Sequence, residues 1–140
     1  MGNLSGGTLG TPFLNFVGRR RRNILTFTFG DGSSNYPSGG VPMPATTPGY
    51  IGLYGLTRVM DAIYIVNTPA DGYVYQISYS TSSGGAPGEK AIASPMVRIW
   101  ESPAVASAPA AAGPLSEVAS GAGGFVPASG VVLTLIVEGW

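Results

Sequence analysis

The chain has 140 residues, of which 22 are glycine and 12 proline, and it contains neither cysteine nor histidine. Long uninterrupted helices are not expected, because glycine and proline both destabilise helix interiors. Hydrophobic residues make up 44% of the chain and charged residues only 10%, the opposite of the balance found in disordered proteins. The composition therefore predicts one all-β domain that is rich in turns.

The missing residue types also exclude several kinds of chemistry. Without cysteine there are no disulfides, thiolate nucleophiles or cysteine metal sites, and without histidine the commonest general base and metal ligand are lost. No segment reaches the roughly 20 apolar residues of a membrane helix, and residues 1–10 form no apolar run of secretory length. We therefore expect synthesis in a cytoplasm and no membrane partner.

Charge is concentrated in one place. The formal net charge is zero, yet four of the seven basic residues are consecutive, at positions 19–22. The rest of the chain is mildly acidic. A soluble monomer usually has about 25% charged residues. The low charge content of this chain suits a protein that ends in an assembly.

Residues 1–22 are predicted to form an extended N-terminal arm or a first edge strand, because Pro12 and several glycines interrupt any helical period. A β-sandwich domain is expected to occupy residues 23–140. Its first strand is predicted over residues 24–29, with one apolar face made by Leu25, Phe27 and Phe29.

A turn is predicted at residues 30–35, where glycine tolerates positive φ and Asp31 can bond to nearby backbone amides. Residues 36–55 contain four prolines, which withhold amide donors and exclude a central strand. We expect this segment to be a long ordered crossover that covers one end of a sheet, as in Greek-key folds.

Residues 57–67 are predicted to form a strand, although residues 60–62 would also suit a short helix. Strand alternation would put positions 59, 61, 63 and 65 on one face and positions 60, 62, 64 and 66 on the other. Residues 69–72 have the chemistry of a tight turn, and residues 73–79 alternate cleanly after it. The two strands are predicted to form the best hairpin in the chain.

In the last third of the chain, residues 80–88 are predicted to be a loop tip and residues 103–114 a linker, while residues 115–119 could add a short strand. Residues 89–102 are predicted to return to strand character around residues 95–101, with either Val97 and Ile99 or Met96 and Trp100 as the inward pair. The apolar run at residues 131–138 predicts a fully buried strand at the centre of a sheet.

Taken together, five to eight strands with long Gly/Pro-rich loops indicate an all-β, single-domain β-sandwich of jelly-roll or Greek-key type. A small barrel is the alternative.

Candidate catalytic residues are few. Lys90, the only lysine, follows a Gly/Ser loop, where a solvated ammonium is expected. Asp31, Asp61 and Asp71 could supply a carboxylate pair as in glycosidases, but Asp31 and Asp71 lie in turn motifs where aspartate has a structural task. The glycine-rich stretches at residues 30–32 and 83–85 lack the lysine and the helix of a phosphate loop, and Asp31 lacks the companion ligands of a Ca²⁺ site. The sequence therefore predicts no enzyme, no cofactor and no metal site.

The arginine run Arg19, Arg20, Arg21 and Arg22 is the candidate partner-binding site. We rank an inter-subunit clamp first, because arginine pairs with carboxylates in bidentate fashion and could dock on an acidic patch of a partner protein. A solvated charge run ranks second. A nucleic-acid arm ranks third, since no basic face supports it on the acidic body.

Seven tyrosines are spread through the chain and could form a stacking platform for sugars or bases. Three of them share one face of the predicted strand 73–79. Cross-strand aromatic packing with hydroxyls at the sheet rim is the preferred interpretation. The set comprises Tyr36, Tyr50, Tyr54, Tyr64, Tyr73, Tyr75 and Tyr79.

One segment carries a resemblance. Residues 25–44 contain Phe-Gly-Asp followed by Tyr-Pro-Ser-Gly-Gly-Val-Pro, a pattern that resembles small structural proteins of tailed bacteriophages. The matching residues form a turn and loop motif: Gly30, Asp31, Tyr36, Pro37, Gly39, Gly40 and Pro42. The match covers about a seventh of the chain. Because the motif is a loop scaffold, no contact residue of the family is carried over.

The resemblance implies a non-enzymatic virion protein of the capsid decoration, or cement, kind. Such a protein would bind the major capsid protein on the capsid surface as a homo-dimer or homo-trimer and stabilise the head, after synthesis in the host cytoplasm. A tail, neck or fibre-associated structural protein is the first alternative. A carbohydrate-binding β-sandwich module, using the tyrosine face, is the second.

Overall fold

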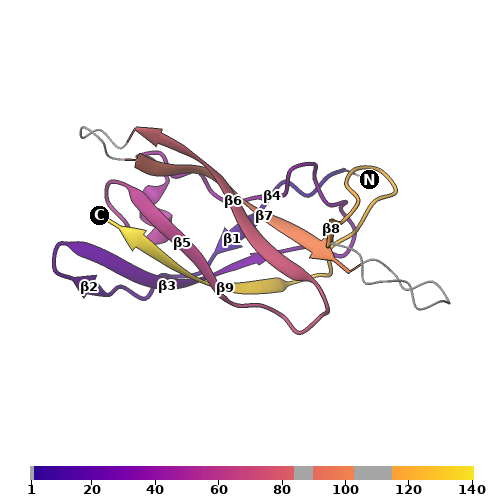
Figure 1. Cartoon of the computed structure of the whole chain (residues 1–140), viewed down its shortest axis with the longest axis horizontal. Helices are drawn as coiled ribbons and strands as arrows, with labels where there is room; N and C mark the ends of the chain where they lie inside the picture. The colour runs from indigo at the N-terminus through magenta and orange to yellow at the C-terminus, as the bar shows by residue number, and fades with distance from the viewer. Residues whose placement is uncertain (1, 84–89, 103–114) are drawn as a thin grey trace.

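The computed structural model describes residues 2–83, 90–102 and 115–140. Within these ranges the chain is nearly all β, with one 3-10 turn, η1 (Ile51–Tyr54), and no α-helix. No helical segment there has the length and apolarity needed to cross a membrane. The strands, drawn in Figure 1, are β1 (Gly7–Leu9), β2 (Phe16–Val17), β3 (Arg20–Phe29), β4 (Val41–Pro42), β5 (Met60–Asn67), β6 (Val74–Ser83), β7 (Lys90–Glu101), β8 (Ser116–Glu117) and β9 (Val131–Gly139).

These strands form two antiparallel sheets. The five-stranded sheet has the order β1-β3-β9-β5, with β2 also paired to β3. The four-stranded sheet has the order β4-β7-β6, with β8 also paired to β7. The position of β9 between β3 and β5 confirms the prediction that residues 131–138 lie at the centre of a sheet.

The prediction that β9 is buried on both faces is wrong. Its residues alternate between buried and more exposed positions, and Val132 is an exposed valine between buried neighbours. The physical reason is that an antiparallel sheet can turn one face to the core and the other to solvent, even where both faces carry apolar side chains.

One core holds the molecule together. The buried side chains of both sheets belong to a single cluster, and the largest share comes from alternate residues of β3 and β9. The predicted inner face of β3, Leu25, Phe27 and Phe29, is confirmed. On β7, Val97 and Ile99 are the buried pair, so the first of the two predicted alternatives is correct.

The predicted hairpin between residues 57–67 and 73–79 does not form. Strand β5 pairs with β9, and β6 pairs with β7 in the other sheet, so residues 68–73 connect the two sheets. The turn chemistry of Asp71 and Gly72 specifies a reversal of the chain, but burial of the apolar face of β5 decides which strand it pairs with.

The alternation predicted along residues 57–67 is interrupted by a bulge. The pairing register of β5 with β9 shifts between Met60 and Ala62. As a result Met60 and Ile63, predicted on opposite faces, are both buried. One extra residue in a strand reverses the facing of all residues that follow it.

The N-terminal residues are joined to the five-stranded sheet. Residues 7–9 form its edge strand β1. Of the two predicted alternatives, an extended arm and a first edge strand, the second is the one found for these residues. The strand predicted to begin at residue 24 begins at Arg20, because β9 continues opposite it as far as Gly139. Strand β3 therefore runs across the predicted domain boundary between residues 22 and 23.

The loops differ in part from prediction. Residues 80–83 belong to β6, whereas the remainder of the predicted loop tip, residues 84–89, lies outside the described residues. The predicted linker at residues 103–114 also lies outside them. The short strand allowed for residues 115–119 is confirmed as β8. Residues 36–55 contain only the two-residue edge strand β4 and the turn η1.

Candidate functional site

Two of the candidate catalytic carboxylates, Asp31 and Asp71, have partners within four residues in the chain. Asp31 accepts hydrogen bonds from the Ser34 hydroxyl at 2.6 Å and from the amides of Ser34 and Ser33 at 2.6 and 2.8 Å. These bonds hold the pKa of Asp31 well below its usual range. Asp71 accepts bonds from the Tyr73 amide and the Tyr75 hydroxyl. Among the described residues, no group of three or more acidic side chains lies close enough to hold a metal ion.

The turn motif at residues 30–42 is a structural hub. Gly30 has φ +92°, and a Cβ built on it would lie 2.0 Å from the carbonyl oxygen of Ala128. Tyr36 is fully buried. Its hydroxyl donates to Glu117 Oε1 at 2.6 Å and accepts from the Ile99 amide at 3.3 Å. Gly30 and Tyr36 therefore tie this loop to residues more than 60 positions later.

The second half of the motif sits against the four-stranded sheet. Gly39 and Gly40 have φ +88° and +116°, and a Cβ on Gly40 would lie 2.9 Å from the Val97 carbonyl oxygen. The amide of Gly40 donates to the carbonyl of Pro37 at 3.2 Å, which closes the turn. Pro42 then occupies the edge strand β4, where a missing amide is tolerated.

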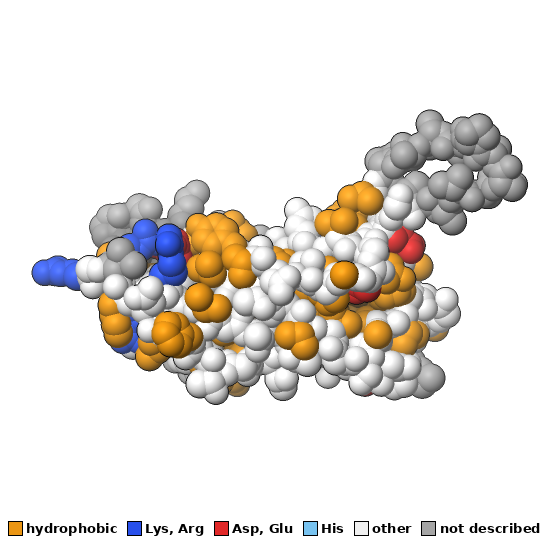
Figure 2. All heavy atoms as spheres, turned by 90° about the horizontal axis from the view of Figure 1, so that it is seen from below, with side chains coloured by type: hydrophobic (Ala, Val, Ile, Leu, Met, Phe, Trp, Pro, Cys, Tyr) orange, Lys and Arg blue, Asp and Glu red, His pale blue; other side chains and the backbone are white. Residues whose placement is uncertain are grey.

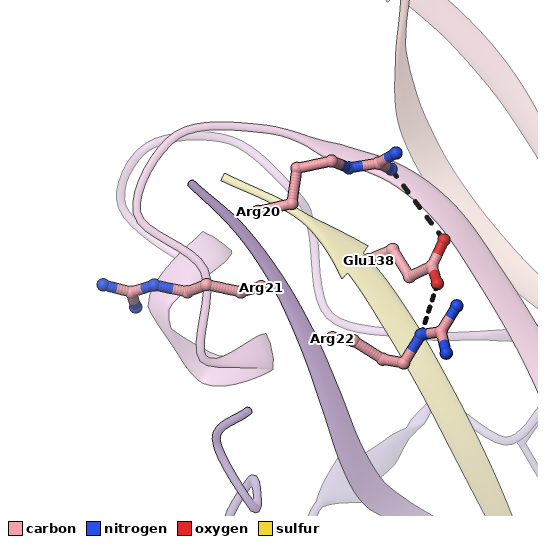
Figure 3. Close-up of a pocket in the computed structure, with 4 residues that line it drawn as sticks. All are labelled: Arg20, Arg21, Arg22 and Glu138. Atoms are coloured by element: carbon pink, nitrogen blue, oxygen red, sulfur yellow. Dashed lines mark hydrogen bonds and ion pairs between the residues drawn. The ribbon is translucent and has the colours of Figure 1, made fainter. Parts of the chain in front are cut away.

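The arginine run forms the end of the molecule where β3, β5 and β9 meet. Arg20 Nη2 lies 2.5 Å from Asp61 Oδ1, and Arg22 Nε lies 2.6 Å from Glu138 Oε1. Figure 3 shows the side chains of Arg20 and Arg22 turned toward Glu138 from either side. Strand register explains the second pair, because Arg22 lies opposite Glu138. Partly exposed ion pairs of this kind contribute about 0–1 kcal/mol each.

Arg21 projects on the other side of β3, as Figure 3 shows. It donates from Nη1 to the Gly55 carbonyl oxygen at 2.8 Å, and its guanidinium carbon lies 5.1 Å from the centre of the Phe16 ring. A guanidinium has five N–H donors, so Arg21 retains donors for a further partner. Arg19 is exposed. The structure thus divides the run into Arg20 and Arg22, which pair with carboxylates of their own sheet, and Arg19 and Arg21, which have no carboxylate partner among the described residues.

Exposed apolar side chains gather at the same end of the molecule as the arginine run. The chain segment before β3 and the segment around η1 meet at Gly55, where an added Cβ would lie 2.6 Å from Leu14 Cδ2. Figure 2 shows blue and orange side chains side by side at this end. We call this surface the arginine end; it comprises Phe13, Leu14, Phe16, Arg19, Arg21, Tyr50 and Leu53, of which Phe13 is 70% exposed.

The buried polar side chain at the base of this end is Asn23. It donates from Nδ2 to the Tyr54 carbonyl at 3.0 Å and accepts from the Asn15 amide at 3.3 Å. Asn23 is fully buried, so both bonds are made without competition from water. They hold the segment before β3 and the turn η1 against the same strand. Asn23 was not predicted as a site residue; its position between apolar Ile24 and the arginines was the available signal.

The tyrosines divide into packing and exposed groups. Tyr36 and Tyr54 are fully buried, and Tyr75 meets Phe29 edge-on with ring centres 6.4 Å apart. Tyr73 packs on Phe125 with ring centres 5.0 Å apart. Cross-strand and core packing therefore accounts for these four side chains, whereas Tyr50, Tyr64 and Tyr79 are exposed on different elements.

Tyr73 and Tyr75 also line a hollow of about 220 Å³. It includes Val131 at the start of β9, whereas the arginine run lies opposite the other end of β9. We call it the Asp71 hollow. Its walls are mainly apolar, and the carboxylate of Asp71 is its one charged group among the described residues; its lining is Asp71, Tyr73, Tyr75, Ile99, Phe125, Val126, Pro127, Ala128 and Val131.

Buried tyrosines give a prediction for alkaline pH. Burial raises the pKa values of Tyr36, Tyr54 and Tyr75 above the ordinary value of about 10. Below pH about 10 these tyrosines are neutral in both the folded and the unfolded chain, and the contribution of their raised pKa values to stability is fully present. As the pH rises above about 10, the unfolded chain ionises first, so the free energy of unfolding falls. Urea unfolding at a series of pH values checks this.

Tyr54→Phe is the control for that experiment, because it removes one of the three hydroxyls, which donates to the Pro44 carbonyl at 2.5 Å. The variant should be less stable at neutral pH by about 1 kcal/mol, since one hydrogen bond is lost. Its stability should depend less steeply on pH in the alkaline range. An unchanged alkaline slope would contradict the assignment.

Comparison of the chain with protein-family models, with curated proteins and with solved structures found no match. The arrangement of its own residues is therefore the basis for a functional proposal. Two features stand out from that arrangement. They are the arginine end, which combines arginines with exposed aromatic rings, and the Asp71 hollow.

Proposed function

We propose that this chain is a β-sandwich protein and a non-enzymatic structural component of a virion. In this proposal it decorates the capsid surface, binds the major capsid protein, assembles as a homo-dimer or homo-trimer, and stabilises the head. The two antiparallel sheets around a single core support the sandwich, which would serve as a rigid spacer. The resemblance of residues 25–44 to phage structural proteins supports the proposed place of the protein in a virion.

The arginine end is the observation that carries the proposal. Protein interfaces are enriched in arginine and aromatic residues, and lysine is depleted in them. Phe13, Phe16 and Leu53 are exposed beside Arg19 and Arg21, and all the cations of the run are arginine. A surface of this kind fits a protein partner that offers apolar side chains and carboxylates. Many copies bound to one shell would turn modest single contacts into stable attachment.

The ion pairs within the chain indicate which arginines are available to bind a partner protein. Arg20 and Arg22 already pair with Asp61 and Glu138, so a partner's carboxylate would have to compete with these ion pairs. Arg19 and Arg21 have no carboxylate partner among the described residues. The clamp predicted for the whole run is thus proposed more narrowly, for Arg19 and Arg21 with the apolar side chains around them.

Titration onto undecorated capsids tests the proposal. The capsids should be assembled from a major capsid protein whose gene lies near the gene of this chain. Binding should saturate at a fixed ratio of this protein to capsid subunits. An Arg19→Ala/Arg21→Ala variant should bind at least about tenfold more weakly and with less dependence on salt. The matched control, Arg20→Ala/Arg22→Ala, removes the same charge and should bind with a smaller loss. Absence of binding by the unaltered chain would overturn the proposal.

A carbohydrate-binding module is the second candidate, and the Asp71 hollow favours it. Aromatic side chains in the walls can stack on a sugar ring, and the carboxylate can accept hydrogen bonds from the hydroxyl groups of the sugar. The Asp71 carboxylate already accepts from Tyr73 and Tyr75, yet each oxygen retains acceptor capacity. Reproducible hits on a glycan array, lost in a Tyr73→Ala variant, would favour this function over capsid binding.

A further inference from the structure

The charged side chains of the described residues are sorted toward two ends of an elongated molecule. One end carries five arginines and two carboxylates: Arg19, Arg20, Arg21, Arg22 and Arg58 with Asp61 and Glu138. The other carries four carboxylates and one arginine: Asp31, Asp71, Glu101 and Glu117 with Arg98. Figure 2 shows blue side chains at one end and red ones toward the other. A zero net charge thus conceals two ends of opposite sign.

The positive end presents a projecting pair of side chains. Phe16 is 61% exposed, and the Arg21 guanidinium lies over its ring at 5.1 Å. The contact between cation and ring keeps the two groups together, so they can act as one unit with an aromatic body and a charged edge. We call this unit the Phe16–Arg21 knob.

The negative end presents a hollow with matching chemistry. The Asp71 hollow has a volume of about 220 Å³, and a cavity of about 150 Å³ is known to accommodate a benzene ring. Its walls include the Tyr73 and Phe125 rings, and Val126 on its lining is 37% exposed. Asp71 supplies the one carboxylate, whose oxygens each retain a free acceptor position for a guanidinium.

We propose that copies of this chain associate head to tail, with the Phe16–Arg21 knob of one copy seated in the Asp71 hollow of the next. Opposite charge favours this contact, whereas pairing two like ends would bring charges of the same sign together. The contact joins two different surfaces, so it builds a ring if the rotation between copies closes and an open chain if it does not. Phe16 and Arg21 also belong to the surface proposed for capsid binding, so a copy whose knob is seated has Arg19, Phe13 and Leu53 left for another partner. The inference does not rest on the proposed capsid role.

Sedimentation velocity of the purified full chain at low salt tests the proposal without any capsid. The unaltered protein should form species larger than a dimer as its concentration rises, and added salt should dissociate them. Arg21→Glu spoils the knob and leaves the hollow intact. Val126→Lys blocks the hollow and leaves the knob intact. Each variant alone should sediment as a monomer.

A mixture of the two variants gives the decisive result. The intact knob of the Val126→Lys copy can enter the intact hollow of the Arg21→Glu copy, but no third copy can add at either end. The mixture should therefore form dimers and nothing larger. Val66→Lys, which places the same charge on an exposed valine outside the hollow, is the matched control and should associate like the unaltered chain.

Asp71→Asn is a further variant that preserves the shape of the hollow and removes its charge. It should weaken association at least about tenfold, which also covers the case in which Val126→Lys fails to fold, as judged by circular dichroism. The proposal is overturned if the unaltered chain stays monomeric at low salt, if Arg21→Glu or Asp71→Asn associates as strongly as the unaltered chain, or if the folded mixture shows no dimers. No capsid is present in these experiments, so their outcome and that of the capsid titration are scored separately.

Discussion

Gly30→Ala should destabilise the protein by about 3 kcal/mol or more. Gly30 has φ +92°, which alanine adopts only with strain, and a Cβ there would lie 2.0 Å from the Ala128 carbonyl oxygen. The obstacle is backbone on the opposite loop, and the Gly130 amide donates to the Gly30 carbonyl at 3.2 Å. Relief of the clash would therefore separate two loops at the start of β9. Chemical denaturation measures the loss.

Gly32→Ala is the matched control. Gly32 lies in the same turn with φ +73°, and the nearest atom to its added Cβ is 3.7 Å away. Only the backbone strain of positive φ remains, so the expected cost is about 1 kcal/mol. The difference between the two variants isolates the contact with Ala128. Equal losses in both would show that φ alone decides the requirement for glycine at residue 30.

Tyr36→Ala should cost about 3–5 kcal/mol, the range for removing a large aromatic side chain from a core. The ring is fully buried within the cluster shared by both sheets. The hydroxyl adds a separate contribution, because it joins Glu117 on β8 to the Ile99 amide on β7. The variant therefore loses packing and leaves two polar groups without this partner.

Tyr36→Phe separates the two effects. It keeps the ring and removes the hydroxyl, so a loss of about 1–2 kcal/mol is expected. Tyr79→Ala, at an exposed tyrosine of β6, should change stability by less than about 0.5 kcal/mol. Thermal and urea unfolding of the three variants checks the order. A Tyr36→Ala variant as stable as Tyr79→Ala would contradict the central position of Tyr36.

Local patterns predicted several elements because the same residues determine both the pattern and the burial. Alternation placed Leu25, Phe27 and Phe29 on the core face, and the length of the apolar run at residues 131–138 indicated a central strand. The glycines of the 30–42 motif adopt the positive φ values that their residue type permits. In each case the deciding interaction lies within a few residues of the pattern.

Pairing between distant segments was not predictable in the same way. Asp71 and Gly72 indicated a turn. No residue near the turn specified that β5 would pair with β9 and β6 with β7, rather than β5 with β6. The bulge after Met60 also depends on its partner strand. Such choices are made by burial over the whole molecule, and a single-residue shift exchanges the two faces of a strand.

The candidate site shows the same limit. The arginine run was visible in the sequence, but the pairing of Arg22 with Glu138 joins residues 116 positions apart and requires the register of β3 on β9. The convergence of Leu14 with Gly55 depends likewise on tertiary structure. Sequence reasoning could identify the cations; the structure was needed to separate Arg20 and Arg22, which pair with carboxylates, from Arg19 and Arg21, which pair with none among the described residues.

The position of β9 has a kinetic consequence. Its two neighbours in the five-stranded sheet, β3 and β5, do not pair with each other, and β3 meets β9 across more than 100 residues of intervening chain. The β6–β7 pair, by contrast, is local in sequence and can form early. Closing the long loop between β3 and β9 carries an entropic cost that no local contact offsets. Folding should therefore be slow and limited by the arrival of β9, before which β3 and β5 expose unpaired edges to other chains.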